Sequence, residues 1–104
     1  MTITDIRIRK LYHEARLKAL VSVTIDGDLA VHDIKVIEGP ERLFVAMPSR
    51  RDETGTFRDI VHPITSAARK TLEEAILTHY NEYIEYIAAQ KGGEQAAAQE
   101  PPAL

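Results

Sequence analysis

The sequence predicts an α+β fold in which an antiparallel β-sheet meander of four to five strands is followed by one long C-terminal α-helix. Three observations support this prediction. Apolar and polar residues alternate through the first half of the chain, short turn sequences separate the alternating runs, and apolar residues of the second half recur at three- and four-residue spacing. Because strands joined by short turns pair antiparallel, we expect a meander rather than a β-α-β unit.

The first two strands are expected within residues 3–9 and 19–25. In the first, isoleucines alternate imperfectly with charged residues. In the second, apolar residues occupy every other position, which is the period of a half-buried strand. Residues 12–16, which separate the two runs, are short and polar enough to form a hairpin loop.

A tight turn is predicted at Asp26-Gly27-Asp28, because glycine accepts the positive φ that such a hairpin requires. The third strand is expected over Leu29–Ile37. Strict alternation along this strand would place Val31 on one face and both Ile34 and Val36 on the other.

A turn at residues 38–41 leads to an expected fourth strand at 42–47. Pro48 ends this strand, because proline has no amide hydrogen with which to extend the ladder. Residues 49–56 are too polar for a core, and we expect them to form an exposed loop. Residues 57–61 could add a short fifth strand.

The remainder of the domain is expected to be helical. Thr65 or Ser66 can serve as the N-cap, because a hydroxyl oxygen accepts a hydrogen bond from the first turn. Gly92-Gly93, just past Lys91, should end the helix. One apolar stripe is expected to face the core. Its members are Ala68, Leu72, Ala75, Ile76, Tyr80, Tyr83, Ile84 and Ile87.

A chain of 104 residues leaves little room for a second domain, so we expect one domain over residues 1–91. Residues 92–104 contain too little apolar surface to offset the entropy of ordering them, and we expect a disordered tail. Four or five strands and a single helix leave sheet edges and part of a sheet face uncovered. We therefore expect a homodimer.

The composition narrows the cellular context. The absence of cysteine excludes disulfides, thiolate metal sites and a cysteine nucleophile. No apolar run approaches the roughly 20 residues that a membrane-spanning helix needs, and the first residues lack the basic and apolar regions of a signal peptide. We expect a cytoplasmic protein that does not insert into membranes.

Residue patterns that would indicate catalysis are missing from the sequence. The four histidines include no pair at helical spacing, no serine lies in a glycine-flanked elbow, and no glycine-rich phosphate loop precedes the helix. His32-Asp33 would bind a metal only if His62 or His79 approached in the fold, and packing within a strand is the commoner role. We therefore expect no enzymatic activity, no cofactor and no small-molecule substrate.

A group of basic residues is the feature that indicates binding. Arg50 and Arg51 follow the fourth strand, Arg58 lies a few residues further on, and Arg69-Lys70 lie in the first turn of the helix. Arginine presents a planar fork of donors that fits phosphate oxygens. If residues 49–56 fold near the helix start, these five cations could form one phosphate-binding surface.

Local neutralisation is the competing interpretation of the same residues. Asp52, Glu53 and Asp59 lie close enough in sequence to form surface salt bridges with the arginines. The whole-chain net charge of −3 also argues against strong indiscriminate binding to nucleic acid, since such proteins are usually basic. From the residues alone, local neutralisation is slightly favoured, because runs of charged residues are usually solvated surface.

Four segments resemble the SpoVG family of bacteria, the stage V sporulation protein G or septation-regulator family. They are Ile3-Thr4-Asp5-Ile6-Arg7-Ile8-Arg9, Val31-His32-Asp33-Ile34-Lys35-Val36-Ile37-Glu38-Gly39, Leu43-Phe44-Val45-Ala46-Met47-Pro48-Ser49-Arg50-Arg51 and Phe57-Arg58-Asp59-Ile60-Val61-His62-Pro63-Ile64. The resemblance covers roughly residues 1–80 in order and at natural spacing, and it weakens beyond Arg69.

The resemblance implies a small dimeric α+β protein without known catalysis. The family is linked to septation and sporulation, and in bacteria that do not sporulate it regulates envelope, capsule and virulence genes. Members bind DNA, and some bind RNA, through basic residues of the Met-Pro-Ser loop and the following helix. This implies nucleic-acid contacts for Arg50 and Arg51, with Arg58, Arg69 and Lys70 in support.

Acidic residues of the helix depart from this expectation. Glu73 and Glu74 directly follow the basic turn and would repel a phosphate backbone. We therefore expect a low affinity for nucleic acid. The alternative hypothesis is a protein–protein adaptor of the division or envelope machinery that uses an exposed sheet edge or the acidic helix face and tail. Loss of Arg50 and Arg51 would leave such an adaptor functional, whereas reversal of Glu82 and Glu85 to lysine would not.

Overall fold

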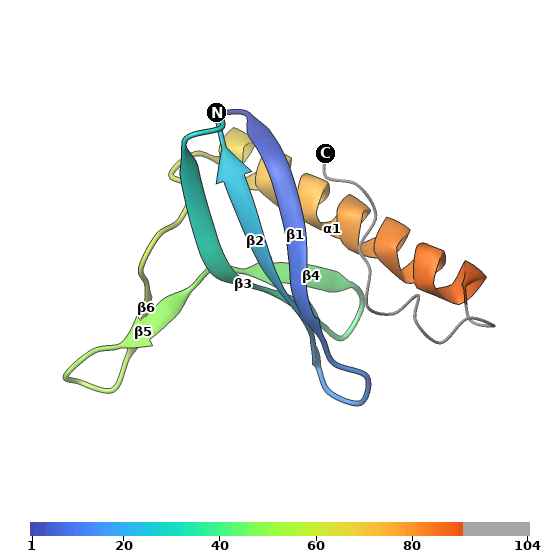
Figure 1. Ribbon diagram of the computed structural model, residues 1–104. Helices are drawn as coiled ribbons and strands as arrows, with labels where there is room; N and C mark the ends of the chain where they lie inside the picture. Colours follow the sequence, from blue (N-terminus) through green and yellow to red (C-terminus); the bar gives the residue numbers. More distant parts are fainter. Residues whose placement is uncertain (91–104) are drawn as a thin grey trace.

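The computed structural model describes residues 1–90, which form a four-stranded antiparallel sheet, a separate two-stranded hairpin and one helix (Figure 1). The sheet has the order β1-β2-β3-β4, so the predicted meander and the C-terminal helix are confirmed. The expected tail at residues 92–104 lies outside the described residues. The elements are β1 (Ile3–Leu11), β2 (Leu17–Ile25), β3 (Leu29–Glu38), β4 (Leu43–Ala46), β5 (Ser49–Arg51), β6 (Phe57–Asp59) and α1 (Ser66–Ala89).

Helix α1 covers one face of the four-stranded sheet and lies behind it in Figure 1. The core forms between these two layers, where the alternating strand positions meet the apolar stripe of the helix. Its buried members are Ile6, Ile8, Ala19, Val21, Val23, Val31, Ile34, Val36, Val45, Met47, Leu72, Ile76, Tyr80 and Tyr83. Within residues 1–90, no helix is long and apolar enough to cross a membrane.

The turn between β2 and β3 forms where it was predicted. Asp26 and Gly27 have positive φ angles of 54° and 69°, which is the requirement for both central residues of a type I′ turn. The amide of Asp28 donates to the carbonyl of Ile25 at 3.0 Å and closes the turn.

Strict alternation along β3 was a wrong prediction. Val31, Ile34 and Val36 are all buried on the same face, because the pairing with β2 shifts by one residue between them. Val21 pairs with Ile34, whereas Val23 pairs with Val31, so two residues of β3 face a single residue of β2. This β-bulge absorbs one residue and returns the next apolar side chain to the core.

The expected exposed loop at residues 49–56 is instead partly a strand. Strands β5 and β6 pair antiparallel. The short strand expected at 57–61 is confirmed for Phe57–Asp59. A further backbone hydrogen bond from the amide of Ile60 to the carbonyl of Pro48, at 2.8 Å, extends the hairpin toward the sheet. All side chains of the segment are polar or exposed, so hydrophobic alternation gave no sign of it.

The helix begins where its capping residues predict. Thr65 is the N-cap, and its hydroxyl accepts a hydrogen bond from the amide of Ala68 at 3.0 Å. The helix ends at Ala89, with Gln90 as its C-cap. Two details of the stripe differ from the prediction, because Ile84 is 38% exposed while His79, a polar residue outside the predicted stripe, is buried.

Candidate nucleic-acid interface

Residues 49–59 form a hairpin arm that leaves the body after β4 and points away from α1 (Figure 1). The arm has no apolar core of its own, since Phe57 is 67% exposed and the neighbouring Ile60 is equally exposed. Its structure therefore depends on backbone pairing and on polar contacts.

The carboxylate of Asp52 organises the tip of the arm. One oxygen accepts hydrogen bonds from the amides of Thr54 and Thr56, at 2.9 and 3.0 Å, and from the Thr54 hydroxyl at 2.6 Å. The other oxygen accepts from Nε of Arg58 at 2.7 Å. Gly55, with a φ of 88°, completes the turn in a conformation that favours glycine.

These contacts lower the pKa of Asp52 from 3.8 to about 2. The hydroxyl of Thr54 is the largest cause, followed by Arg58 and then by the amide of Thr56. Each of them hydrogen-bonds the ionised form and so favours it. The tip is consequently organised around a charged carboxylate throughout the physiological pH range.

Two arginines face each other across the arm. Arg50 and Arg58 are directly opposite in the register of β5 and β6, so both side chains extend from the same face of the hairpin. Like charges in this position destabilise a strand pair. Nε of Arg58 donates to Asp52. The terminal nitrogens of the same guanidinium carry further donors that can bind an external anion.

Arg51 lies on the opposite face of β5 because successive strand residues alternate. Its guanidinium carbon is 5.6 Å from the centroid of the Phe57 ring, and its Nε donates to the carbonyl of Gly55 at 3.4 Å. The Phe57 ring is 67% exposed, and Arg51 is exposed as well. A flat cation backed by an aromatic ring can pair with a phosphate or stack against a base.

Arg69 has a structural partner on the sheet. Its Nη2 donates to the carbonyl of Val45 at 3.2 Å, while Glu73, one helical turn later, accepts from the amide of Val45 at 3.2 Å. β4 is an edge strand, so the two side chains satisfy backbone groups that would otherwise be available to another strand. We call this pair of contacts the edge clamp.

The structure therefore divides the five predicted cations between two places. Arg50, Arg51 and Arg58 lie together on the arm, whereas Arg69 joins the edge clamp and the exposed Lys70 follows it on α1. The arm points away from the helix, so the five do not form one surface (Figure 1).

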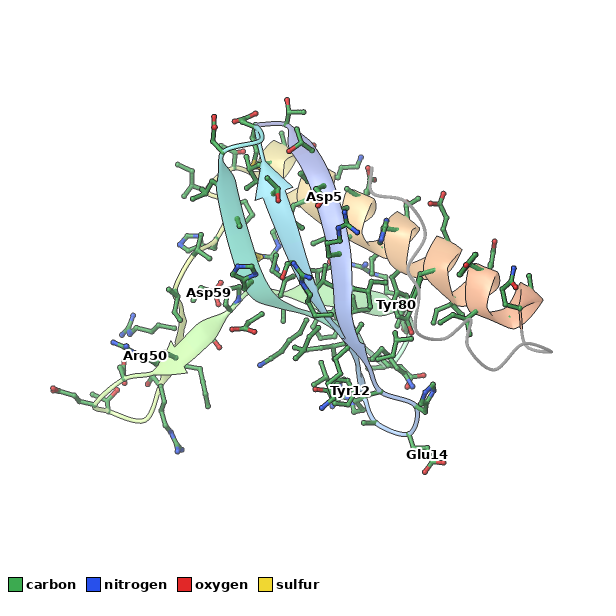
Figure 2. All side chains as sticks on the ribbon, viewed as in Figure 1. Asp5, Tyr12, Glu14, Arg50, Asp59 and Tyr80 are labelled. Carbon is green, nitrogen blue, oxygen red and sulfur yellow. The ribbon has the colours of Figure 1, made fainter. Side chains whose placement is uncertain are left out.

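The competing interpretation, that acidic neighbours neutralise the arginines, holds for Arg58. Asp52 forms an ion pair with Arg58 at 2.7 Å. Figure 2 shows Arg50 on the arm and Asp59 near the point where the arm leaves the body. Three acidic residues, Asp52, Glu53 and Asp59, balance the three arginines in formal charge. Binding at the arm would thus depend on the geometry of its donors rather than on a large net charge.

A polar cluster on the open face of the sheet was missed by the sequence reasoning. Ser22 is buried although it lies on the face away from α1, and it contacts both Arg9 and His32. Regular alternation puts Ser22 and Arg9 on the open face but groups His32 with Ile34 and Val36, so it does not bring the three residues together. The contacts also depend on strand register, which the sequence does not reveal.

No metal-binding group emerges among the described residues. Across residues 1–90, no three side chains of histidine, cysteine, aspartate or glutamate gather in a way that could hold a metal ion. His32, the histidine considered for this role, is hydrogen-bonded through Nδ1 to Ser22 at 2.8 Å.

The fold and the arm define a class of protein: a small two-layer sheet-and-helix domain that displays arginines on a protruding hairpin. The SpoVG family model matches residues 1–82, which is most of the chain. The chain belongs to the SpoVG family, as the four segments indicated.

Relatives of high identity carry the same description. A protein of a Thermoanaerobacter species is 55% identical over 91 residues, which cover 88% of this chain and 99% of the relative. A Clostridium novyi protein is 47% identical over 100 residues, covering 96% of this chain and all of the relative. A Caldanaerobacter subterraneus protein is 59% identical over 80 residues, covering 77% and 88%. Each is named "Putative septation protein SpoVG".

Proposed function

We propose that this protein is a non-enzymatic, cytoplasmic regulator of septation, and of sporulation in spore-forming bacteria, that acts as a homodimer by binding DNA or RNA. Membership of the SpoVG family and the names of its relatives support the connection with septation. The arrangement of arginines on the arm supports nucleic acid as the ligand. Arg50, Arg51 and Arg58 are the proposed contacts, and Arg69 and Lys70 are the secondary ones.

One observation carries the choice of ligand. Arg50 and Arg58 lie directly opposite each other on an exposed strand pair, where the ion pair between Asp52 and Arg58 offsets only part of their repulsion. A phosphate between the two guanidinium groups would turn this repulsion into two charge-assisted contacts. An anion bound between the two guanidinium groups would therefore stabilise the arm.

The charge of the whole chain determines how strongly we expect it to bind nucleic acid. With a net charge of −3 and acidic residues on α1, long-range attraction to a polyanion is weak. Affinity should therefore depend on the few direct phosphate contacts of the arm. If affinity fell with salt more steeply than three phosphate contacts predict, residues outside the arm would also bind phosphates.

Fluorescence anisotropy with labelled duplex DNA, single-stranded DNA and RNA, titrated over salt, tests the proposal. We expect binding that weakens linearly in log affinity against log salt, with a slope near 0.9 per phosphate for duplex DNA and about 0.7 for single strands. The ranking of the three probes identifies the preferred nucleic acid. Absence of binding to all three at low salt would refute the proposal.

A charge-matched pair of double variants locates the contacts. Arg50→Ala with Arg51→Ala should weaken binding and reduce the salt slope by about two contacts. Arg16→Ala with Arg42→Ala removes the same charge from exposed loops away from the arm and should leave the slope unchanged. Equal effects of the two pairs would mean that net charge, not the arm, determines binding.

A protein–protein adaptor is the second candidate. Glu82 and Glu85 are both exposed on α1, where an acidic helix face is open to a partner. Reversing both to lysine should leave nucleic-acid binding intact or strengthen it if the arm is the binding site. An adaptor would instead lose its partner on this change and tolerate the loss of Arg50 and Arg51.

A further inference from the structure

The open face of the sheet, opposite α1, carries a polar cluster that neither the fold nor the arm explains. We call it the Ser22 cluster, formed by Arg9 on β1, Ser22 on β2 and His32 on β3. Ser22 is 5% exposed, whereas Arg9 and His32 are exposed and cover it. One small hydroxyl is thus buried beneath two side chains that can carry positive charge.

The hydrogen bonds of the cluster use Nε of Arg9 and Nδ1 of His32. Nε of Arg9 donates to the Ser22 hydroxyl oxygen at 3.2 Å, and that oxygen lies 2.8 Å from Nδ1 of His32. Since Ser22 accepts from Arg9, its own proton can be donated to Nδ1 of a neutral imidazole. The N–H of that imidazole is then at Nε2. The terminal guanidinium donors of Arg9 and Nε2 of His32 are left for a ligand.

The two strands that flank Ser22, β1 and β3, each shift their register against β2 close to this residue. Arg9 is the extra residue where β1 shifts against β2, and His32 and Asp33 form the bulge where β3 shifts against Ser22. Asp33 has a φ of 63°, a conformation that few residues other than glycine adopt. Bulges redirect side chains and occur preferentially near functional sites. Here, one bulge on each side brings Arg9 and His32 to the same hydroxyl.

Basic and acidic side chains surround the Ser22 cluster on the open face of the sheet. Arg7 pairs directly with Ser22 across the strands, and its Nε is bound to Asp5 at 3.1 Å. Lys35 lies on the same open face of β3, and Asp33 contributes an exposed carboxylate beside His32. Arg7, Arg9 and Lys35 against Asp5 and Asp33 leave these five side chains with a net charge of +1.

One residue of the cluster, His32, lies beside the base of the arm. A shallow groove is lined by residues of β3, including His32 and Asp33, and by Pro48 and Ile60 at the two ends of the arm. The rest of the groove lining is apolar, so His32 is the residue of the groove that can contact a phosphate near the base of the arm.

We propose that the Ser22 cluster is a second phosphate-binding site, which takes one phosphodiester group of the nucleic acid whose backbone the arm contacts. The inference rests on the proposed function for its ligand. Terminal donors of Arg9 and Nε2 of His32 bind the phosphate oxygens, while Ser22 keeps both side chains in place. No hydrogen bond of the free protein has to break, so the site is preorganised.

Side-chain NMR of the full chain tests this inference separately from the function. Arginine Nε–Hε and histidine ring signals are followed while a short single-stranded DNA oligonucleotide is added. Shifts of Arg9 and His32 together with those of the arm arginines support the site. Shifts confined to the arm overturn the site but leave the proposed function standing. Shifts confined to Arg9 and His32 support the site and refute the assignment to the arm.

Two further results of the titration contradict the site. No shift in either place refutes the proposed function and the site with it. Inorganic phosphate is the second probe, added alone. Shifts of the cluster with inorganic phosphate but not with the oligonucleotide would show a site for a free anion and overturn the phosphodiester assignment.

A matched pair of single variants measures the contribution of the site. Arg9→Gln should weaken oligonucleotide binding about fivefold and lower the salt slope by about one contact. Arg42→Gln makes the same change on an exposed loop and should do neither. Equal affinity of the two variants, with circular dichroism unchanged, would overturn the inference.

Discussion

The arm and the body of this protein are stabilised by opposite kinds of residue. The body buries apolar side chains from four strands against one face of α1. The arm buries none, and a single carboxylate, Asp52, organises its tip. Figure 2 shows the labelled Arg50 far from the packed layers of the body. Residues of the arm can therefore be selected for binding with little effect on the fold.

Charged side chains also have different roles in the body and in the arm. In the body, Arg69 and Glu73 satisfy the backbone of an edge strand and so protect the sheet. On the arm, Arg50 and Arg58 oppose each other at a cost to the strand pair. Arginine is structural in the first setting and a candidate binding group in the second.

The largest expected effect comes from the core of the body. Ile76→Ala removes a fully buried side chain between α1 and the sheet and should lower the free energy of unfolding by about 2–5 kcal/mol. Chemical denaturation measures this loss. Amide shifts of residues 49–59 should stay unchanged below the transition. Shifts in the arm as large as those in β4 would show that the two regions are not separable.

The edge clamp should have the next largest effect. Glu73→Ala leaves the amide of Val45 without its acceptor and should cost about 1–2 kcal/mol of stability, measured by denaturation. Glu74→Ala, an exposed neighbour, is the control and should cost less than about 0.5 kcal/mol. If both variants lost the same stability, the contact between Glu73 and Val45 would add nothing beyond what an exposed glutamate of this helix contributes.

The smallest effect is confined to the tip of the arm. The pKa of Asp52 is lowered to about 2, so its carboxylate stabilises the folded tip fully above the ordinary value near 3.8. That stabilisation should be lost as the pH falls through 2. Carboxyl carbon NMR should give a titration midpoint near 2, and Asp52→Asn should alter the shifts of residues 52–58 while the body keeps its stability. A midpoint near 3.8 would contradict the described tip.

Much of the body could be predicted from the sequence because burial on one side imposes a period. Isoleucine and valine at every second position marked the strands, and the turn at Asp26-Gly27 needed residues that accept positive φ. The bulge at Asp33 was not predictable in this way. Alternation assumes a regular strand, whereas the shift is set by pairing with β2.

The candidate site was predictable as a set of residues but not as a geometry. Arg50, Arg51 and Arg58 were recognised from their charge and from the resemblance to the SpoVG family. The contact between Arg69 and Val45 spans 24 residues, and no local pattern reports it. Strand β5 and its pairing with β6 were missed, because a segment exposed on both faces has no hydrophobic period to detect.

One substitution tests the central claim most directly, that the arm is arranged for binding rather than for stability. Arg50→Thr removes one of two opposed charges and adds a residue that favours strands. Paired measurements of thermal unfolding and of nucleic-acid affinity should show stability that is equal or higher and affinity that is lower. Reduced stability, or affinity equal to that of the unsubstituted protein, would contradict the account.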